Sequence, residues 1–217
     1  MITILYEDRT LVVCIKPPAL LSQSGNGADI LQILGQQLSC ILYPVHRLDR
    51  GVGGVMVFAK TSKAAAALSA AIQKREFEKE YLCVVRGKPA EETGVYKDLL
   101  LHDKARNKTF VVDRIRGGVK DASLEYRVLA EQNGASLVRV KLHTGRTHQI
   151  RVQFASRKTP LLGDGKYGGG SGQIALWSWQ LSFPHPNTGK RLSFSYLPEG
   201  GVWDQFSKEV FPTIEEV

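Results

Sequence analysis

Residues 43–57 read YPVHRLDRGVGGVMV, and this segment decides how the chain is organised. A single acid, Asp49, lies between Arg47 and Arg50, and glycines follow it. The apolar run at 55–58 predicts a buried strand, because it is short, rich in branched residues and bounded by glycine. The residues before this run are therefore expected to form a loop that holds Asp49 at the start of the strand.

The carboxylate of Asp49 has two possible roles. An opposite charge close by favours the ionised form of an acid, so the two flanking arginines should keep Asp49 charged. An ionised carboxylate that is held in place can act as a nucleophile or as a base. The same residue could instead tie a turn or pair with a structural arginine. A short Arg-Leu-Asp-Arg motif does not by itself distinguish these roles.

The composition indicates a single globular domain with an excess of positive charge. A length of 217 residues suits one domain, expected to span residues 1–217, and the 43% hydrophobic content is enough for a core. The 29 lysines and arginines exceed the 21 acids, and the resulting net charge of +8 suits a polyanionic partner such as a nucleic acid. Many basic proteins have no such partner, so charge alone leaves the question open.

The cysteines and the N-terminal sequence bear on the compartment. Cys14, Cys40 and Cys83 are far apart and odd in number, which excludes a disulfide framework and a zinc pattern. Free thiols of this kind are expected in a reducing cytoplasm. The first eight residues lack the basic region of a signal peptide, and no apolar run is long enough to span a membrane. We therefore expect a cytoplasmic protein with no membrane partner.

Residue patterns predict many strands and few helices. Residues 89–118 are the least regular part, with many cations and few large apolar residues, and are expected to form either a loop or hairpin that grips a polyanion or simply a solvated excursion. A polar loop at 23–28 and a frayed end at 213–217 are also expected. The mixture indicates an α+β fold with a mixed, mainly antiparallel central sheet flanked by helices and long loops. Strands are expected at 2–6, 11–15, 55–58, 79–87, 122–129, 136–142, 175–183 and 192–194, with a turn at 132–134, and helices at 29–38, at 63–74 after Ser62 as N-cap, and from Thr147 onwards.

Four blocks of the sequence match one family in the same order. They are HRLD at 46–49, KEY at 79–81, GRTHQIRVQF at 145–154 and PLLGDGKYG at 160–168. Together they resemble the RluA-type pseudouridine synthases, and the resemblance extends from about Tyr6 to about Pro198. It implies the pseudouridine synthase fold and an RNA uridine as the substrate.

The resemblance also implies a role for each matched residue. Asp49 would be the catalytic nucleophile or base, Tyr81 would lie against the target base, and Arg151 would form a salt bridge with Asp49. Arg47, beside the aspartate, would help to fill the place that the flipped nucleotide leaves. The remaining predicted RNA contacts are His46, Arg146 and His148 in the matched blocks, and Arg157 and Lys158 in the acid-free run 132–163.

The sequence departs from the family pattern at two notable places. The family usually has Thr-Ser-Gly where this chain has Val52, Gly53 and Gly54, and it commonly has a histidine near Trp177. The lost hydroxyls bear on the geometry and efficiency of the loop. They also motivate an alternative, a non-catalytic RNA-binding assembly factor with a degenerate synthase fold. Retention of Asp49, Tyr81 and Arg151 together favours the enzyme, because binding alone would not require all three.

No metal or cofactor is expected. The five histidines show no ligand spacing with acids or thiols, and the sequence after Asp164 lacks the other acids of a calcium loop. The isomerisation breaks the bond from the sugar to ring nitrogen 1 and remakes it to ring carbon 5, so nothing is oxidised and no group is imported. The expected partner is RNA, either transfer or ribosomal, and the chain is expected to be a monomer.

Overall fold

The computed structural model describes residues 1–23 and 27–211, which divide into two compact units. Unit 1 comprises Met1–Glu80 and Trp177–Pro198, and unit 2 comprises Tyr81–Leu176 and Glu199–Val217. Each unit is therefore built from two separate parts of the chain. The expected loop at 23–28 lies partly, and the expected frayed end at 213–217 wholly, outside the described residues. The expectation of a single domain stays a prediction.

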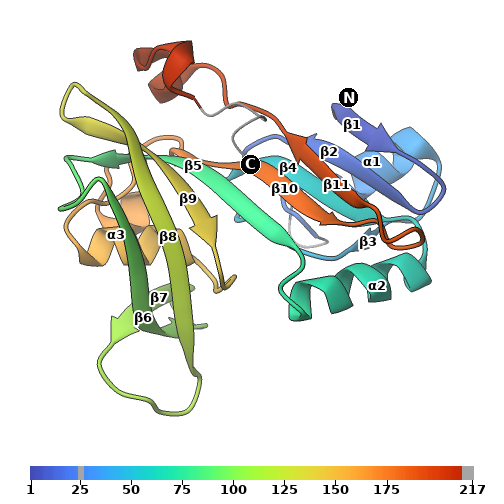
Figure 1. The fold of residues 1–217 in the computed structure, drawn as a ribbon, viewed down its shortest axis with the longest axis horizontal. Coiled ribbons are helices and arrows are strands. Elements are labelled where there is room, and N and C mark those ends of the chain that lie inside the picture. The colour runs from blue at the N-terminus through green and yellow to red at the C-terminus, as the bar shows by residue number, and fades with distance from the viewer. Residues whose placement is uncertain (24–26, 212–217) are drawn as a thin grey trace. The chain divides into compact units, whose positions relative to one another are not determined.

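Unit 1 contains a sheet covered by helices (Figure 1). Its strand order is β1-β2-β4-β10, with β3 paired to β4 and β11 paired to β10. β4 and β10 run parallel, whereas β1 with β2, β2 with β4, and β10 with β11 are antiparallel. The elements are β1 (Ile4–Glu7), β2 (Leu11–Lys16), α1 (Ile30–Leu38), β3 (Tyr43–Pro44), β4 (Gly53–Ala59), α2 (Ser62–Gln73), β10 (Leu176–Pro184) and β11 (Arg191–Ser195).

The central strands of unit 1 follow from their composition. All seven residues of β4 are buried, which confirms the strand predicted around 55–58. Its neighbour β2 is also fully buried and ends at Lys16, because the two prolines that follow cannot donate hydrogen bonds to a ladder. Val55 and Val57 pack with Leu11, Leu68 and other apolar side chains into one core cluster.

The two helices of unit 1 begin at side-chain caps. Asp29 accepts a hydrogen bond of 2.8 Å from the Gln32 amide and starts α1 close to the predicted position. The predicted cap Ser62 of α2 is wrong by one residue. Thr61, with extended backbone angles, is the cap, and its hydroxyl accepts from the Ala64 amide at 3.1 Å, whereas Ser62 is already helical.

Unit 2 contains further strands and an α-helix, and among these strands β8 with β9, β6 with β8, and β6 with β7 are antiparallel. Its strand order is β5-β9-β8-β6-β7. The turn between β8 and β9 has Asn133 and Gly134 at φ +52° and +72°, which confirms the predicted hairpin turn. The elements are β5 (Glu78–Arg86), β6 (Thr93–Asp103), β7 (Lys108–Val112), β8 (Val119–Gln132), β9 (Ala135–Leu142), α3 (Gln149–Ser156) and the 3-10 helices Gly165–Tyr167, Gly201–Gln205 and Lys208–Val210.

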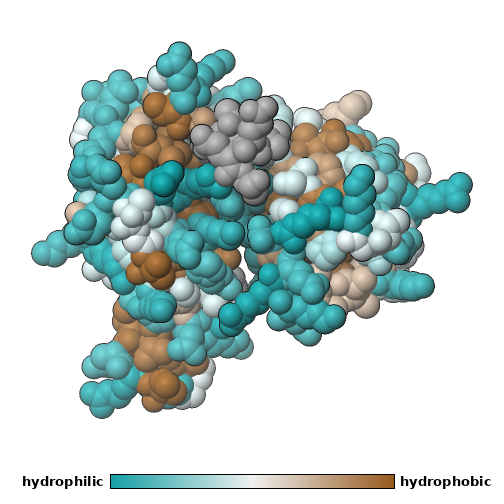
Figure 2. Space-filling model, in the orientation of Figure 1, coloured by the Kyte–Doolittle hydropathy of each residue, from teal (hydrophilic) through white to brown (hydrophobic). Residues whose placement is uncertain are grey.

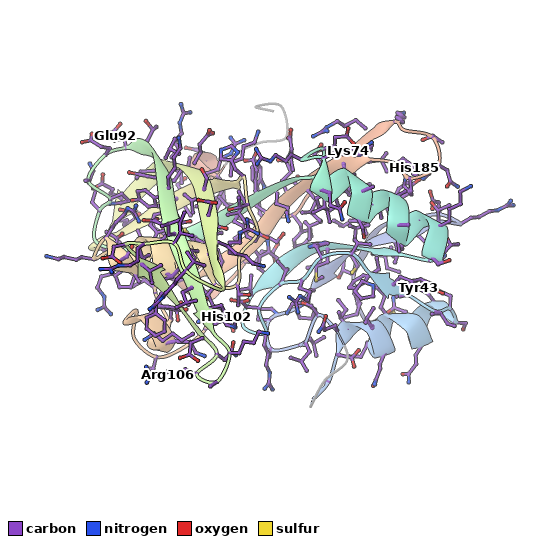
Figure 3. The ribbon with its side chains drawn as sticks, turned by 90° about the horizontal axis from the view of Figure 1, so that it is seen from below. Tyr43, Lys74, Glu92, His102, Arg106 and His185 are labelled. Carbon is purple, nitrogen blue, oxygen red and sulfur yellow. The ribbon has the colours of Figure 1, made fainter. Side chains whose placement is uncertain are left out.

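Of the alternatives left open for 89–118, the structure shows the hairpin. This region forms β6 and β7, which pair with each other, and β6 also pairs with β8 over nine residues. β6 is stable with few large apolar residues because one of its faces is covered by the rest of unit 2. On that face Tyr96 and Leu100 are buried, and Tyr96 packs against the rings of Tyr126 and Phe154. Arg106 lies in the turn between β6 and β7, near His102 at the end of β6 (Figure 3).

The described surface is largely polar. The view in Figure 2 is mostly hydrophilic, and among the described residues the large apolar side chains that are more than half exposed are Met1, Ile41, Val95 and Ile115. None of the helices formed by residues 1–23 and 27–211 has the length and apolar content required to cross a membrane. The predicted α+β class, with mixed and mainly antiparallel strands, is confirmed.

Candidate active site

The loop that carries Asp49 is anchored on both sides by residues 16–22. The Ser22 hydroxyl donates to the Leu48 carbonyl at 2.7 Å and accepts from the Leu48 amide at 3.0 Å. After the aspartate, the Ala19 amide donates to the Arg50 carbonyl at 2.8 Å, and Arg50 Nε returns a bond of 3.1 Å to the Ala19 carbonyl. The backbone at Asp49 is thus held by contacts at both neighbouring residues.

A buried lysine supports the same loop. Lys16 is 0% exposed, and its Nζ donates to the carbonyls of Pro17 at 3.0 Å, Leu20 at 2.8 Å and Arg50 at 3.4 Å. Burial lowers the pKa of Lys16 to about 8, while the negative charge of Asp49 acts in the opposite direction. The Asp49 carboxylate therefore favours the charged form of the buried Lys16 ammonium.

Sequence reasoning missed Lys16 and emphasised the flanking arginines instead. The available signal was the Lys-Pro pair at the end of a strand in the part of the chain that resembles the opening of the family's domain. The glycine at position 54 follows from the same local geometry. Gly54 has φ +120°, and a Cβ there would lie 2.2 Å from the Ser178 carbonyl oxygen, so a side chain is excluded.

His46 lies inside unit 1 rather than on its surface. Its Nε2 accepts a hydrogen bond of 3.2 Å from the Val57 amide, and its ring packs against Phe77 with 5.5 Å between centroids. Burial lowers the pKa of His46 to about 3, so the ring is neutral near pH 7. The ring joins the loop to β4, and its burial gives no support to the RNA contact predicted for it. Arg47, by contrast, is exposed.

Arg151 and Asp164 form a buried ion pair in unit 2. Arg151 Nε donates to Asp164 Oδ2 at 2.6 Å and its terminal nitrogen donates to Oδ1 at 2.9 Å, with side chains only 6% and 1% exposed. The guanidinium also lies 5.1 Å from the centre of the Tyr167 ring. The sequence placed Asp164 in the matched block at 160–168 but did not predict this partner. The predicted salt bridge between Arg151 and Asp49 stays a prediction.

The N-terminus of α3 is fixed by a network around His148. This residue has φ +54°, and its Nδ1 lies 3.0 Å from the Tyr167 hydroxyl. That hydroxyl accepts from the Thr109 amide at 2.7 Å, and the Thr109 hydroxyl donates to the Thr147 carbonyl at 2.8 Å. The network holds β7 against the segment that carries the GRTHQIR block. His148 is 8% exposed and Tyr81, on β5, is 6% exposed.

The predicted RNA-binding cations differ in their surroundings. Arg157 makes a bidentate pair with Asp98 at 3.0 and 3.1 Å and stacks 3.9 Å from the Tyr96 ring centre, which gives it a packing role that sequence reasoning did not foresee. Arg146 is half-buried, and its Nε donates to the Asp121 carbonyl at 2.8 Å. Lys158 is exposed, as a phosphate contact would require.

With the loop and the four blocks located, comparison with known proteins gives the family. The family described as RNA pseudouridylate synthase matches residues 10–156, which include Asp49, Tyr81 and Arg151. This chain belongs to the RNA pseudouridylate synthase family. The resemblance drawn from the motifs is therefore confirmed.

Curated members of the family match most of this chain. Ribosomal large subunit pseudouridine synthase D of Nitrosomonas europaea is 36% identical over 217 residues, covering 90% of this chain and 62% of that protein. An uncharacterized RNA pseudouridine synthase of Aquifex aeolicus is 34% identical, covering 89% of this chain and 68% of its own. The chain thus spans about two thirds of the length of these relatives.

Solved structures of the family share the fold. Human RNA Pseudouridylate Synthase Domain Containing 4 superposes with a TM-score of 0.77 at 26% identity, covering 90% of this chain and 88% of that one. Human RNA Pseudouridylate Synthase Domain Containing 1 gives a TM-score of 0.78 at 20% identity, with 91% and 84% covered. The pseudouridine synthase fold predicted from the motifs is confirmed.

Proposed function

We propose that this chain is an RNA pseudouridine synthase that isomerises a specific uridine, with Asp49 as the nucleophile or base. The observation that carries the proposal is the Asp49 loop, which is bonded through its backbone on both sides and supported by the buried Lys16, whose ammonium donates to the Arg50 carbonyl and interacts electrostatically with Asp49. A turn aspartate with a purely structural role would not require this support. Family membership supplies the reaction that such a carboxylate would perform.

The chemistry needs an ionised carboxylate and a place for the detached base. Asp49 either attacks the anomeric carbon of the ribose or removes the proton at the 2′ carbon, and both routes break the bond to ring nitrogen 1. The uracil then turns and bonds through carbon 5 to the anomeric carbon, which releases the Asp49 carboxylate on the first route and takes place with return of the proton to the 2′ carbon on the second. Carbon 5 then loses a proton, and nitrogen 1 gains one. We assign Tyr81 to stacking on the uracil, and Arg151, oriented by Asp164, to pairing with Asp49. Because the reaction is an isomerisation, it requires no cofactor.

Access to the uridine requires the nucleotide to leave its stack. Flipping a base out of a helix costs roughly a few kcal/mol. Arg47 is exposed and lies two residues before Asp49 in the sequence, so we assign it to the vacated position. We place Arg146, His148 and Lys158 of unit 2 on the side that contacts the RNA, and we infer that both units act together as one catalytic domain.

Large-subunit ribosomal RNA is the first substrate to test. The relatives from Nitrosomonas europaea and Vibrio parahaemolyticus are both called ribosomal large subunit pseudouridine synthase D. Transfer RNA, which the motifs leave equally open, is the second. We further propose that the protein acts as a monomer in the cytoplasm, where both RNAs are found.

The test measures tritium released from carbon 5 of labelled uridine. Wild-type protein is incubated with large-subunit ribosomal RNA and, separately, with transfer RNA, and compared with the Asp49→Asn variant. We expect release by the wild type from one RNA only and background release by the variant, with RNA affinity within about tenfold, or ~1.4 kcal/mol. Tight RNA binding without release by the wild type would favour the non-catalytic assembly factor.

A further inference from the structure

The two departures from the family pattern lie face to face in unit 1. In the parallel pairing of β4 with β10, Trp177 lies opposite Gly53 and Ser178 opposite Gly54. A Cβ built on Gly53 would lie 2.4 Å from Cζ3 and 2.9 Å from Cε3 of the Trp177 ring, and 3.0 Å from Pro18 Cδ. Carbon atoms in good contact are about 3.5–4.0 Å apart. The indole ring therefore occupies the space that a side chain at position 53 would need.

The ring is held in this position. Its Nε1 donates a hydrogen bond of 2.7 Å to the Tyr196 carbonyl, and the ring packs against the core cluster of β2, β4 and β10. Pro18 approaches Gly53 as well, and it belongs to the segment that bonds to the Asp49 loop. A side chain at position 53 would therefore displace either an anchored ring or the anchoring segment itself.

Where the family usually has two hydroxyl side chains, at 52 and 53, this chain has apolar packing. In this chain the residue without a side chain, Gly53 on β4, lies opposite the large ring of Trp177 on β10. Val52, which replaces the usual threonine, is 2% exposed and donates its amide to the Asp49 carbonyl at 3.0 Å. Apolar packing thus replaces side-chain hydrogen bonds next to the turn.

We infer that Trp177 is a positioning residue for Asp49: its indole ring, seated on Gly53, fixes the turn that presents the carboxylate. The inference rests on the proposed function, because it concerns the rate of the reaction. Gly53 follows Val52 directly, so a shift of the strand start is transmitted to the turn closed by the Val52 amide. A misplacement of about 1 Å at a reacting group can lower a rate on the order of 100-fold.

The experiment places serine at position 53 with and without a smaller residue at 177. Gly53→Ser should lower kcat on the order of 100-fold with little change in KM for RNA, because the fault lies in positioning and not in binding. Adding Trp177→His to Gly53→Ser should restore kcat by about tenfold or more, a coupling of ~1.4 kcal/mol. Trp177→His alone is measured to complete the cycle.

Gly54→Ser is the matched control. A Cβ at position 54 meets the backbone of Ser178 at 2.2 Å, not the indole ring, so Trp177→His should not rescue Gly54→Ser. Rescue at 53 but not at 54 supports the inference. A fully active Gly53→Ser variant, equal rescue at both positions, or a kcat loss that merely follows the unfolded fraction overturns it.

Melting temperatures of the same variants separate this inference from the proposed function. If the wild type releases no tritium from any RNA, the proposed function fails, while stability still reports on the packing. A non-additive effect at 53 and 177 that is absent at 54 and 177 then supports the contact between the ring and Gly53. Additive effects at both pairs overturn it.

Discussion

The buried pair of Arg151 and Asp164 allows a quantitative prediction for Asp164→Asn. The substitution keeps the size of the side chain and removes its charge, leaving the Arg151 guanidinium, whose side chain is 6% exposed, without its bidentate carboxylate. Removing one partner of a buried ion pair costs about 3–5 kcal/mol. For a protein of this size each kcal/mol lowers the melting temperature by ~2–4 °C, so the variant should melt roughly 6–20 °C lower.

A matched surface pair provides the control. Lys88 and Glu131 form an ion pair whose side chains are 47% and 44% exposed. Exposed pairs contribute about 0–1 kcal/mol, so Glu131→Gln should change the melting temperature by no more than ~4 °C. Thermal unfolding of both variants, followed by circular dichroism, gives the comparison. Equal changes in melting temperature for the two variants would refute the argument that burial increases the free-energy cost of breaking the Arg151 pair.

Two further predictions concern charge. Above its folded pKa of about 8, Lys16 is neutral in the folded protein, whereas in the unfolded chain it keeps its proton up to its ordinary pKa of 10.5. Because the unfolded state binds more protons in this range, the free energy of unfolding relative to Lys16→Met should rise from pH 8 to pH 10. Over the same range tritium release by the wild type should fall, because Asp49 loses its buried cation; parallel trends in stability and activity would contradict this. Lys158→Ala should lower the slope of log affinity against log salt by ~0.7–0.9, the value of one phosphate contact, in RNA-binding titrations. Arg157→Ala should instead lower the melting temperature, because it breaks the ion pair with Asp98. If Arg157→Ala reduced the salt slope more than Lys158→Ala did, Arg157 would be the phosphate contact and Lys158 would not.

Local patterns were sufficient for most of the secondary structure. The buried strand after the Asp49 loop, the β8–β9 turn and the helices of unit 1 were predicted because burial periodicity, turn residues and caps act within a few residues. The choice between a hairpin and a solvated loop at 89–118 stayed open for the same reason. Strands β6 and β7 are half-covered by neighbours far along the chain, so their own composition carries too little apolar signal.

For the candidate site as well, some features could be predicted from the sequence and others could not. The sequence by itself determined the family, and it predicted Asp49 as nucleophile or base together with the matched residues Tyr81 and Arg151, because a reaction requires particular groups at positions that can be recognised in the chain. It also identified both departures, at the loop glycine and at Trp177, without indicating that they are related.

Tertiary structure alone decided which partners Lys16, Arg157 and Trp177 have. Lys16 reaches the Arg50 carbonyl 34 residues away, Arg157 pairs with Asp98 at a separation of 59, and Trp177 packs on Gly53 through the pairing of β4 with β10. Periodicity reports only that a side chain is buried. Which group it meets depends on strand order and register, which are set by contacts across the whole unit.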